Sequence, residues 1–185
     1  MQFHVDDKYL EITGFRAVKF ADAETFLKAN RQGPKQNSDT QFFDADLIAT
    51  HQHLYFSALY ALQAFKNKTN IAKTLAMEIM LYASAQRQIQ RAIQRLGIKP
   101  QTTNMAAIIV SKDPTEIAGL LKSIEACVGS AAEDNVLEMS QAKEEKICIA
   151  FQITDAELDS VITGTKREAV VDLVIERAAL LATQL

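Results

Sequence analysis

The 185-residue sequence predicts an α+β fold, a single mixed α/β domain over residues 1–185 with a small, mostly antiparallel sheet and about six to eight helices. Three observations predict it. The length and an apolar content of 48% suffice for one hydrophobic core and are short for two. The sequence patterns of β-strands occur in three short stretches, over residues 9–18, 40–49 and 104–111. Several longer stretches place apolar residues at the three-and-four spacing of an amphipathic helix.

The strand patterns lie near the N-terminus and at the centre of the chain. Residues 9–18 (YLEITGFRAV) alternate apolar and polar side chains around Gly14, as in an edge hairpin or a bent strand. Residues 40–49 (TQFFDADLIA) suggest a second strand that leads into a helix start. Residues 104–111 (NMAAIIVS) form a short apolar run rich in β-branched residues, which predicts a buried strand.

Capping residues, glycines and prolines set the bounds of the predicted helices. Tyr55, Phe56 and Tyr60 widen the apolar face of the second helix, so we expect that helix to be largely covered. The predicted helices are one from Asp22 to Gly33–Pro34, one over 50–65, one running from its N-cap Asn70 to Gly97, one from the N-cap Asp113 to Gly129, one through 139–151 after a short strand, one turn capped by Thr154, and one over 165–185.

The composition excludes several classes of protein. The net charge of −3 argues against a surface covered in nucleic acid, although it allows a local basic patch. Cys127 and Cys148 lack the paired spacing of a zinc site or a redox dithiol, which favours buried, reduced thiols. The N-terminus lacks the basic start and apolar block of a signal peptide, and no apolar run is long enough to span a bilayer. We therefore expect a cytoplasmic protein that is not embedded in a membrane.

No motif assembles into an active site, so we expect no catalytic residue, cofactor or metal. The sequence has no phosphate-binding loop, nucleophile elbow or glycine-rich dinucleotide turn. His51 and His53 diverge by about 200° on a helix, so they cannot share a metal and are expected to be surface or capped histidines. Glu78 in an apolar turn indicates either a perturbed catalytic acid or, more commonly, a buried carboxylate paired with an arginine.

A cationic segment follows Glu78. No acidic residue occurs again before Asp113, although Arg87, Arg91, Arg95 and Lys99 all lie in between. At about 100° per residue, a helix buries Ile89, Ala92, Ile93 and Leu96 on one side and exposes the arginines on the other. The segment is either a solvated face whose arginines favour the helix C-terminus or a contact surface for a polyanion. Solvated faces usually mix both signs of charge, which favours the polyanion.

The segment NIAKTLAMEIMLYASAQRQIQRAIQRLGIKP (70–100), preceded by FFDADLIATHQHLYFSALYALQAF (42–65), resembles the archaeal and eukaryotic family of the small regulatory KEOPS subunit, the PRPK-binding protein. The apolar MEIMLYAS leading directly into RQI carries the resemblance, which covers about residues 40 to 110 well. Family members often have a glycine just before RQI. This chain has Ala85 there, so we expect a helix that runs on more smoothly.

The resemblance implies a mixed α/β domain without catalysis that binds the KEOPS protein kinase/ATPase. KEOPS makes threonylcarbamoyl-adenosine beside the anticodon of tRNA, and in this family the subunit is implicated in gripping the tRNA CCA end, which would let the anticodon loop reach the transferase subunit. Arg87 and Gln88 match the family motif and Ile89 matches its buried residue, whereas Arg91, Arg95 and Lys99 extend the patch by spacing alone. We expect Arg87, Arg91 and Lys99 to contact phosphates and Gln88 to bond a ribose or a base edge.

The kinase requires a different surface. A groove between residues 51–65 and the C-terminal helix is one possibility, because exposed apolar patches mark interfaces. Its predicted contacts are Leu54, Leu62, Val170, Val174 and Leu181. The C-terminal helix is equally well explained as a central core helix. Two further functions remain open, a small enzyme that uses Glu78 with an arginine and a structural dimerisation module.

Overall fold

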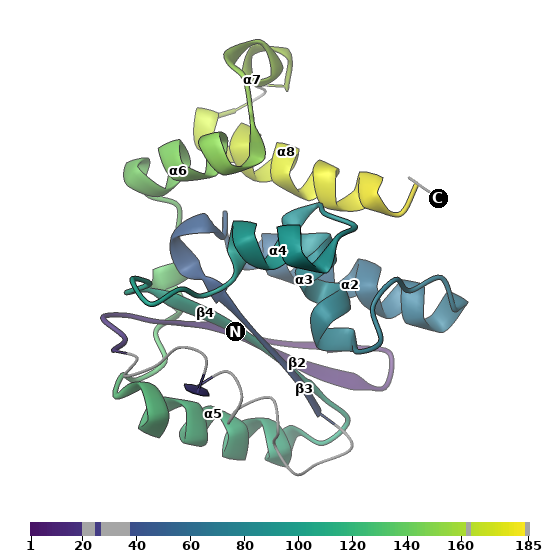
Figure 1. The fold of residues 1–185 in the computed structure, drawn as a ribbon, viewed down its shortest axis with the longest axis vertical. Coiled ribbons are helices and arrows are strands. Elements are labelled where there is room, and N and C mark those ends of the chain that lie inside the picture. Colours follow the sequence, from purple (N-terminus) through teal and green to yellow (C-terminus); the bar gives the residue numbers. More distant parts are fainter. Residues whose placement is uncertain (20–24, 27–37, 162–163, 184–185) are drawn as a thin grey trace.

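A computed structural model describes residues 1–19, 25–26, 38–161 and 164–183. The described residues contain one antiparallel sheet with the strand order β1-β2-β4-β3 (Figure 1). Its strands are β1 (Gln2–Val5), β2 (Lys8–Phe15), β3 (Ser38–Asp44) and β4 (Met105–Ser111). The three predicted strand regions are confirmed, and β1 adds a strand that the sequence patterns missed. The helix predicted over 22–33 lies outside the described residues, except for residues 25 and 26.

β4 is an inner strand of the sheet and has apolar layers on both of its faces. All seven of its residues are buried. Ala106, Ile108 and Val110 belong to the larger core cluster. Met105 and Ile109 belong to the smaller one, which α5 (Pro114–Val128) covers. Burial on both faces explains why this strand appears in the sequence as a continuous apolar run instead of an alternating one.

Helices lie on the opposite side of the sheet from α5 in two tiers (Figure 1). The tier nearer the sheet contains α2 (His51–Asn67), α3 (Leu75–Ser84) and α4 (Ile89–Leu96), and the tier beyond it contains α6 (Gln141–Phe151), α7 (Asp155–Val161) and α8 (Lys166–Leu181). Together with the sheet they make the predicted α+β fold, which is confirmed. No helix in the described part of the chain has the length and apolar character needed to cross a membrane.

The continuous helix predicted from Asn70 to Gly97 is wrong. Asn70 donates its side-chain amide to the Ala72 carbonyl, and Thr74 is the residue that caps α3. α3 then ends at Ala85, which adopts a left-handed conformation with φ 49° and ψ 44°. The Ala85 and Gln86 amides donate to the carbonyls of Tyr82 and Leu81. These two bonds form a Schellman motif, which closes α3 before α4 begins.

Three smaller predictions fail for local reasons. The strand expected before residue 139 is replaced by a 3-10 turn, Asp134–Leu137, and by a single antiparallel bridge between Phe15 and Ala132. Cys127 is exposed and Cys148 half-buried, so neither is a fully buried thiol, and both are free. His53 is fully buried and not a surface residue: its Nδ1 accepts from the Ala49 amide, and its Nε2 lies 2.8 Å from the Ala83 carbonyl.

Candidate functional site

α4 buries a narrower side than its sequence predicts. Ala92 and Leu96 are fully buried, whereas Ile89 is 43% exposed and Ile93 is 37% exposed. The prediction that both isoleucines are buried is therefore wrong. The helix is only eight residues long and packs against the end of α3, so the side that carries Ala92 and Leu96 is covered and the neighbouring side is not.

Four of the five predicted RNA-binding residues lie at or near the surface. Arg87, Gln88 and Arg91 are exposed, and Lys99 is half-buried just beyond the end of α4. Neither Arg91 nor Lys99 forms an ion pair with any carboxylate in the described residues. We call Arg87, Gln88, Arg91 and Lys99 the basic face. Ile89 and Ile93 supply apolar surface beside it, so the exposed side of α4 offers both cations and apolar contacts.

Arg95 is placed differently from the prediction. It is half-buried, and its Nη1 donates to the Ser84 carbonyl at 2.8 Å. Its guanidinium carbon lies 5.4 Å from the centroid of the Phe151 ring in α6. Burial, and then the nearby charge of Arg177, hold the pKa of Arg95 below its ordinary value. Arg95 therefore joins α4 to the end of α3 and to α6, with only part of its guanidinium left for a ligand.

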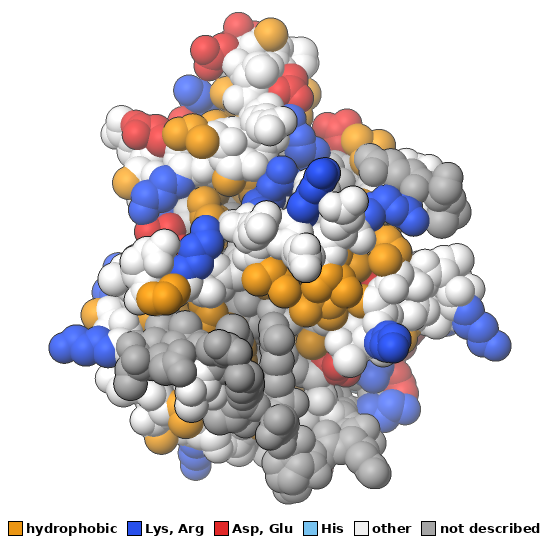
Figure 2. Space-filling model, in the orientation of Figure 1, with side chains coloured by type: hydrophobic (Ala, Val, Ile, Leu, Met, Phe, Trp, Pro, Cys, Tyr) orange, Lys and Arg blue, Asp and Glu red, His pale blue; other side chains and the backbone are white. Residues whose placement is uncertain are grey.

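Lysine and arginine side chains gather along the border between α4 and the layer of α6 and α8, and acidic side chains are sparse there (Figure 2). The sequence explains this distribution, because residues 79–112 contain no Asp or Glu. Acids near this border are in ion pairs: Glu144 of α6 pairs with Lys166 and Arg167 of α8, and Glu157 of α7 pairs with Arg177 of α8.

The predicted kinase contacts lie mostly in the core. Leu54, Val170, Val174 and Leu181 are at most 3% exposed, and only Leu62 is half-buried. The structure does bring them together, because α2 and α8 pack against each other and all five belong to or contact the larger core cluster. The apolar residues of α8 are therefore explained by the packing of one side of the helix against the core, while its other side is exposed. A partner cannot reach the four buried side chains in this fold.

α2 instead presents an aromatic strip of Tyr55, Phe56, Leu59 and Tyr60, all half-buried. The rings of Phe56 and Tyr60 stack with centroids 6.5 Å apart, and those of Tyr55 and Phe56 meet edge-on at 5.5 Å. Sequence reasoning assigned these side chains to a covered face. The signal that could have identified the strip is its spacing: the four residues occupy one side of the helix, next to the side that carries Leu54, Ala58 and Ala61.

Glu78 is fully buried, but its carboxylate is not paired with an arginine anywhere in the described residues. Its Oε2 accepts from the Ala72 amide at 2.6 Å and from the Ile71 amide at 3.0 Å. The predicted arginine partner is thus wrong. By accepting these backbone hydrogen bonds, the carboxylate holds the loop that precedes α3 in place. The arrangement indicates a structural role for Glu78.

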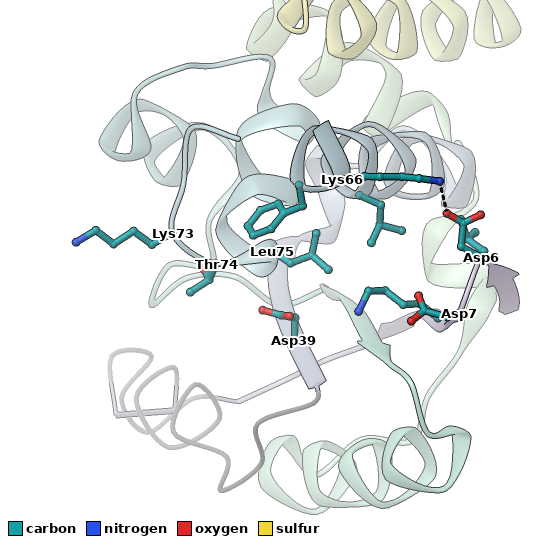
Figure 3. Close-up of a pocket in the computed structure, with 11 residues that line it drawn as sticks. Asp6, Asp7, Asp39, Lys66, Lys73, Thr74 and Leu75 are labelled. Carbon is teal, nitrogen blue, oxygen red and sulfur yellow. Dashed lines mark hydrogen bonds and ion pairs between the residues drawn. The ribbon is translucent and has the colours of Figure 1, made fainter. Parts of the chain in front are cut away.

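A cavity of about 570 Å³ lies between the β1–β2 turn, the end of α2 and the start of α3 (Figure 3). Leu62, Phe65 and Leu75 contribute apolar surface. Its acidic groups are already engaged: Asp6 pairs with Lys66 at 3.1 Å, Asp7 pairs with Lys112, and Asp39 accepts from the Ala76 amide of α3. Across the described residues, no three His, Cys, Asp or Glu side chains lie close enough together to hold a metal ion.

The comparisons with known proteins agree with the resemblance in the sequence. The model of a family described as "Kinase binding protein CGI-121" matches residues 15–182. A curated relative, "Regulatory protein Cgi121" of Methanocaldococcus jannaschii, is 34% identical over 113 residues. That match covers 61% of this chain and 70% of the relative.

Proposed function

Because the chain belongs to the family of the kinase binding protein CGI-121, we propose that it is a non-catalytic regulatory subunit of the KEOPS complex. In this role it binds the protein kinase/ATPase of the complex in the cytoplasm and helps to recruit tRNA for threonylcarbamoyl-adenosine formation. The observation that carries the proposal is the family match, which spans nearly the whole chain. The basic face of α4 supports the RNA part separately.

The aromatic strip of α2 is our candidate for the kinase contact. Aromatic side chains are enriched at the centres of protein interfaces, where they bury a large area at a low cost in side-chain entropy. The strip is half-buried in the isolated chain, so a partner would complete its burial. On the kinase we expect a complementary apolar surface, whose contact favours one conformation of the kinase.

Capture of the cognate KEOPS kinase by the purified chain tests this contact. Phe56→Glu places a charge in the middle of the strip and is expected to weaken capture at least tenfold. Gln63→Glu is the matched control, because Gln63 is exposed on the same helix and the change adds the same charge. Equal capture by both variants would remove α2 from the interface, and no capture by the unaltered chain would refute the kinase role.

The basic face is our candidate for the tRNA contact. Guanidinium groups bind phosphate oxygens in a bidentate manner, and residues 79–112 contain no acid that would repel the RNA backbone. Arg87, Arg91 and Lys99 would contact phosphates, and Gln88 would bond a ribose or a base edge. Held by its CCA end, a tRNA could present its anticodon loop to the transferase subunit.

A salt titration with full-length tRNA and with tRNA lacking its CCA end tests the RNA role. We expect weaker binding of the shortened tRNA, and a roughly tenfold loss of affinity in Arg91→Glu. Lys122→Glu is the control, because Lys122 is exposed on α5, across the sheet, and the charge change is identical. Equal affinity for both tRNAs would refute the proposed contact with the CCA end. Equal affinity of both variants for tRNA would refute the basic face as the RNA-binding surface.

A further inference from the structure

Arg177 in α8 has an incompletely satisfied guanidinium. Its Nη2 donates to Glu157 Oε1 at 2.7 Å and, more weakly, to the Gln152 carbonyl at 3.4 Å. Its Nη1 is buried and has no hydrogen-bond partner. A guanidinium has five N–H donors, and buried donors without an acceptor cost folding free energy. This arrangement therefore needs an explanation beyond the ion pair with Glu157.

Arg95 brings a second guanidinium to the same place. It reaches the end of α6 from α4, where it lies over Phe151, the residue next to Gln152. The charge of Arg177 lies close enough to lower the pKa of Arg95 further, after the larger effect of burial. Glu157 is the one carboxylate within ion-pair distance of either arginine in the described residues. Two cations and one anion leave a net positive charge at this junction.

The structural contacts of Arg95 and Arg177 do not explain the unpaired Nη1 of Arg177 or the like charge beside it. Arg177 alone suffices to join α8 to Glu157 in α7, and the capping bonds from Thr154 hold Glu157 in place. Neither contact explains why the positive charge of Arg95 lies beside Arg177. Neither contact supplies an acceptor for Nη1 of Arg177. Like charges in a partly buried position repel each other, and an anion beside both of them offsets that repulsion. The donors and the charge both indicate an acceptor group with several oxygen atoms.

We propose that Arg95 and Arg177 form a phosphate site at the junction of α4, α6 and α8. This inference rests on the proposed RNA role, and the phosphate belongs to an RNA strand that continues from the basic face. In Figure 2 the basic side chains extend from α4 toward α8, which fits such a path. The Arg177 side chain is 23% exposed, so a phosphate can approach it from solvent. There it replaces the Glu157 carboxylate, and a rotation of the guanidinium presents Nη1 to a second oxygen.

Salt titrations with full-length tRNA test the site through three variants. Arg177→Gln is expected to weaken binding about tenfold and to lower the slope of log affinity against log salt by about 0.7, the value for one phosphate of a single strand. Glu157→Gln is expected to tighten binding about twofold to threefold, because it removes the competing carboxylate. Arg167→Gln is the matched control: Arg167 is 52% exposed, lies on the same helix and also forms an ion pair with a glutamate.

The outcomes separate this inference from the function on which it rests. If Glu157→Gln weakens binding as Arg177→Gln does, the ion pair is a structural tie between α7 and α8, and the site is refuted. If Arg177→Gln binds like Arg167→Gln while Arg91→Glu still loses affinity, the basic face stands without the new site. Melting curves of each variant confirm that it is folded.

A second experiment uses inorganic phosphate as the probe, and calorimetry measures its binding to the unaltered chain and to Arg177→Gln. We expect phosphate to compete with tRNA for the unaltered chain and not for Arg177→Gln. Saturable phosphate binding by a chain that shows no tRNA affinity would assign the site to a small phosphate-bearing molecule. That result would overturn the RNA assignment.

Discussion

Replacing Ala85 by glycine is expected to stabilise the protein. Ala85 ends α3 with φ 49° and ψ 44°, a left-handed conformation in which the side-chain Cβ is crowded by the backbone. The Schellman bonds of Ala85 and Gln86 hold it there, because they satisfy the carbonyls of Tyr82 and Leu81. Glycine adopts the same conformation without the crowding, so Ala85→Gly keeps the motif and removes the strain.

Three terms set the size of the effect. Relief of the left-handed strain contributes about 1 to 2 kcal/mol. The greater freedom of glycine in the unfolded chain costs about 0.4 to 1 kcal/mol. Loss of a half-buried methyl costs a few tenths of a kcal/mol. The midpoints of these ranges leave a net gain of about 0.5 kcal/mol, which for a chain of this length raises the melting temperature by about 1 to 2 °C.

Urea denaturation measures this gain, with Ala118→Gly as the control. Ala118 is exposed inside α5, where its backbone is right-handed, so glycine there should cost about 1 kcal/mol. The two Ala-to-Gly changes are thus expected to have opposite signs. Equal destabilisation would refute the left-handed conformation and the helix break at Ala85. Because α4 already starts after this break, Ala85→Gly should leave tRNA affinity unchanged.

Three further predictions concern stability. Glu78→Gln should lower the free energy of unfolding in urea by about 2 kcal/mol, since the loop amides lose a charged acceptor. Burial lowers the pKa of His53 from 6.5 to about 4, so the unfolded state binds one more proton between those pH values. The free energy of unfolding should therefore fall as the pH drops through this window, and His53→Gln should flatten that dependence. Gly14→Ala should cost about 1 to 3 kcal/mol, because its Cβ would lie 2.5 Å from Val136 Cβ, whereas Gly119→Ala, with nothing within 4 Å, should gain about 1 kcal/mol in thermal melts.

The sequence determined the fold class well because its long-range pattern is strong. The apolar run at 104–111 could be placed as a buried strand, and Asp113 and Gly129 could be placed at the ends of α5. Asp113 does accept from the Thr115 amide, and Gly129 is left-handed with φ 68°. These helix ends depend on local backbone conformation, and the residue types glycine and aspartate indicate them directly in the sequence.

The helix break at Ala85 was harder to predict, because a non-glycine residue makes it. Lys68 and Gln152 also end helices in left-handed conformations, but the predicted helix ends at 65 and 151 lie within two residues of the ends in the structure. The packing of the following helices keeps each of them there at a local cost. A prediction that uses glycine as the signal for a helix end therefore joins α3 and α4 into one helix. The same prediction buries the side chains of Ile89 and Ile93 and exposes that of Arg95.

The break at Ala85 also separates the two candidate surfaces. α3 packs against α2 on one side and α4 on the other, and all but two of its ten residues are buried (Figure 1). A continuous helix over 70–97 would carry the basic residues along the axis of α3. Because the chain turns at Ala85, α4 can lie against the end of α3 and point its arginines toward α6 and α8. The aromatic strip stays on α2, so the proposed kinase and RNA contacts lie on different elements that share one core.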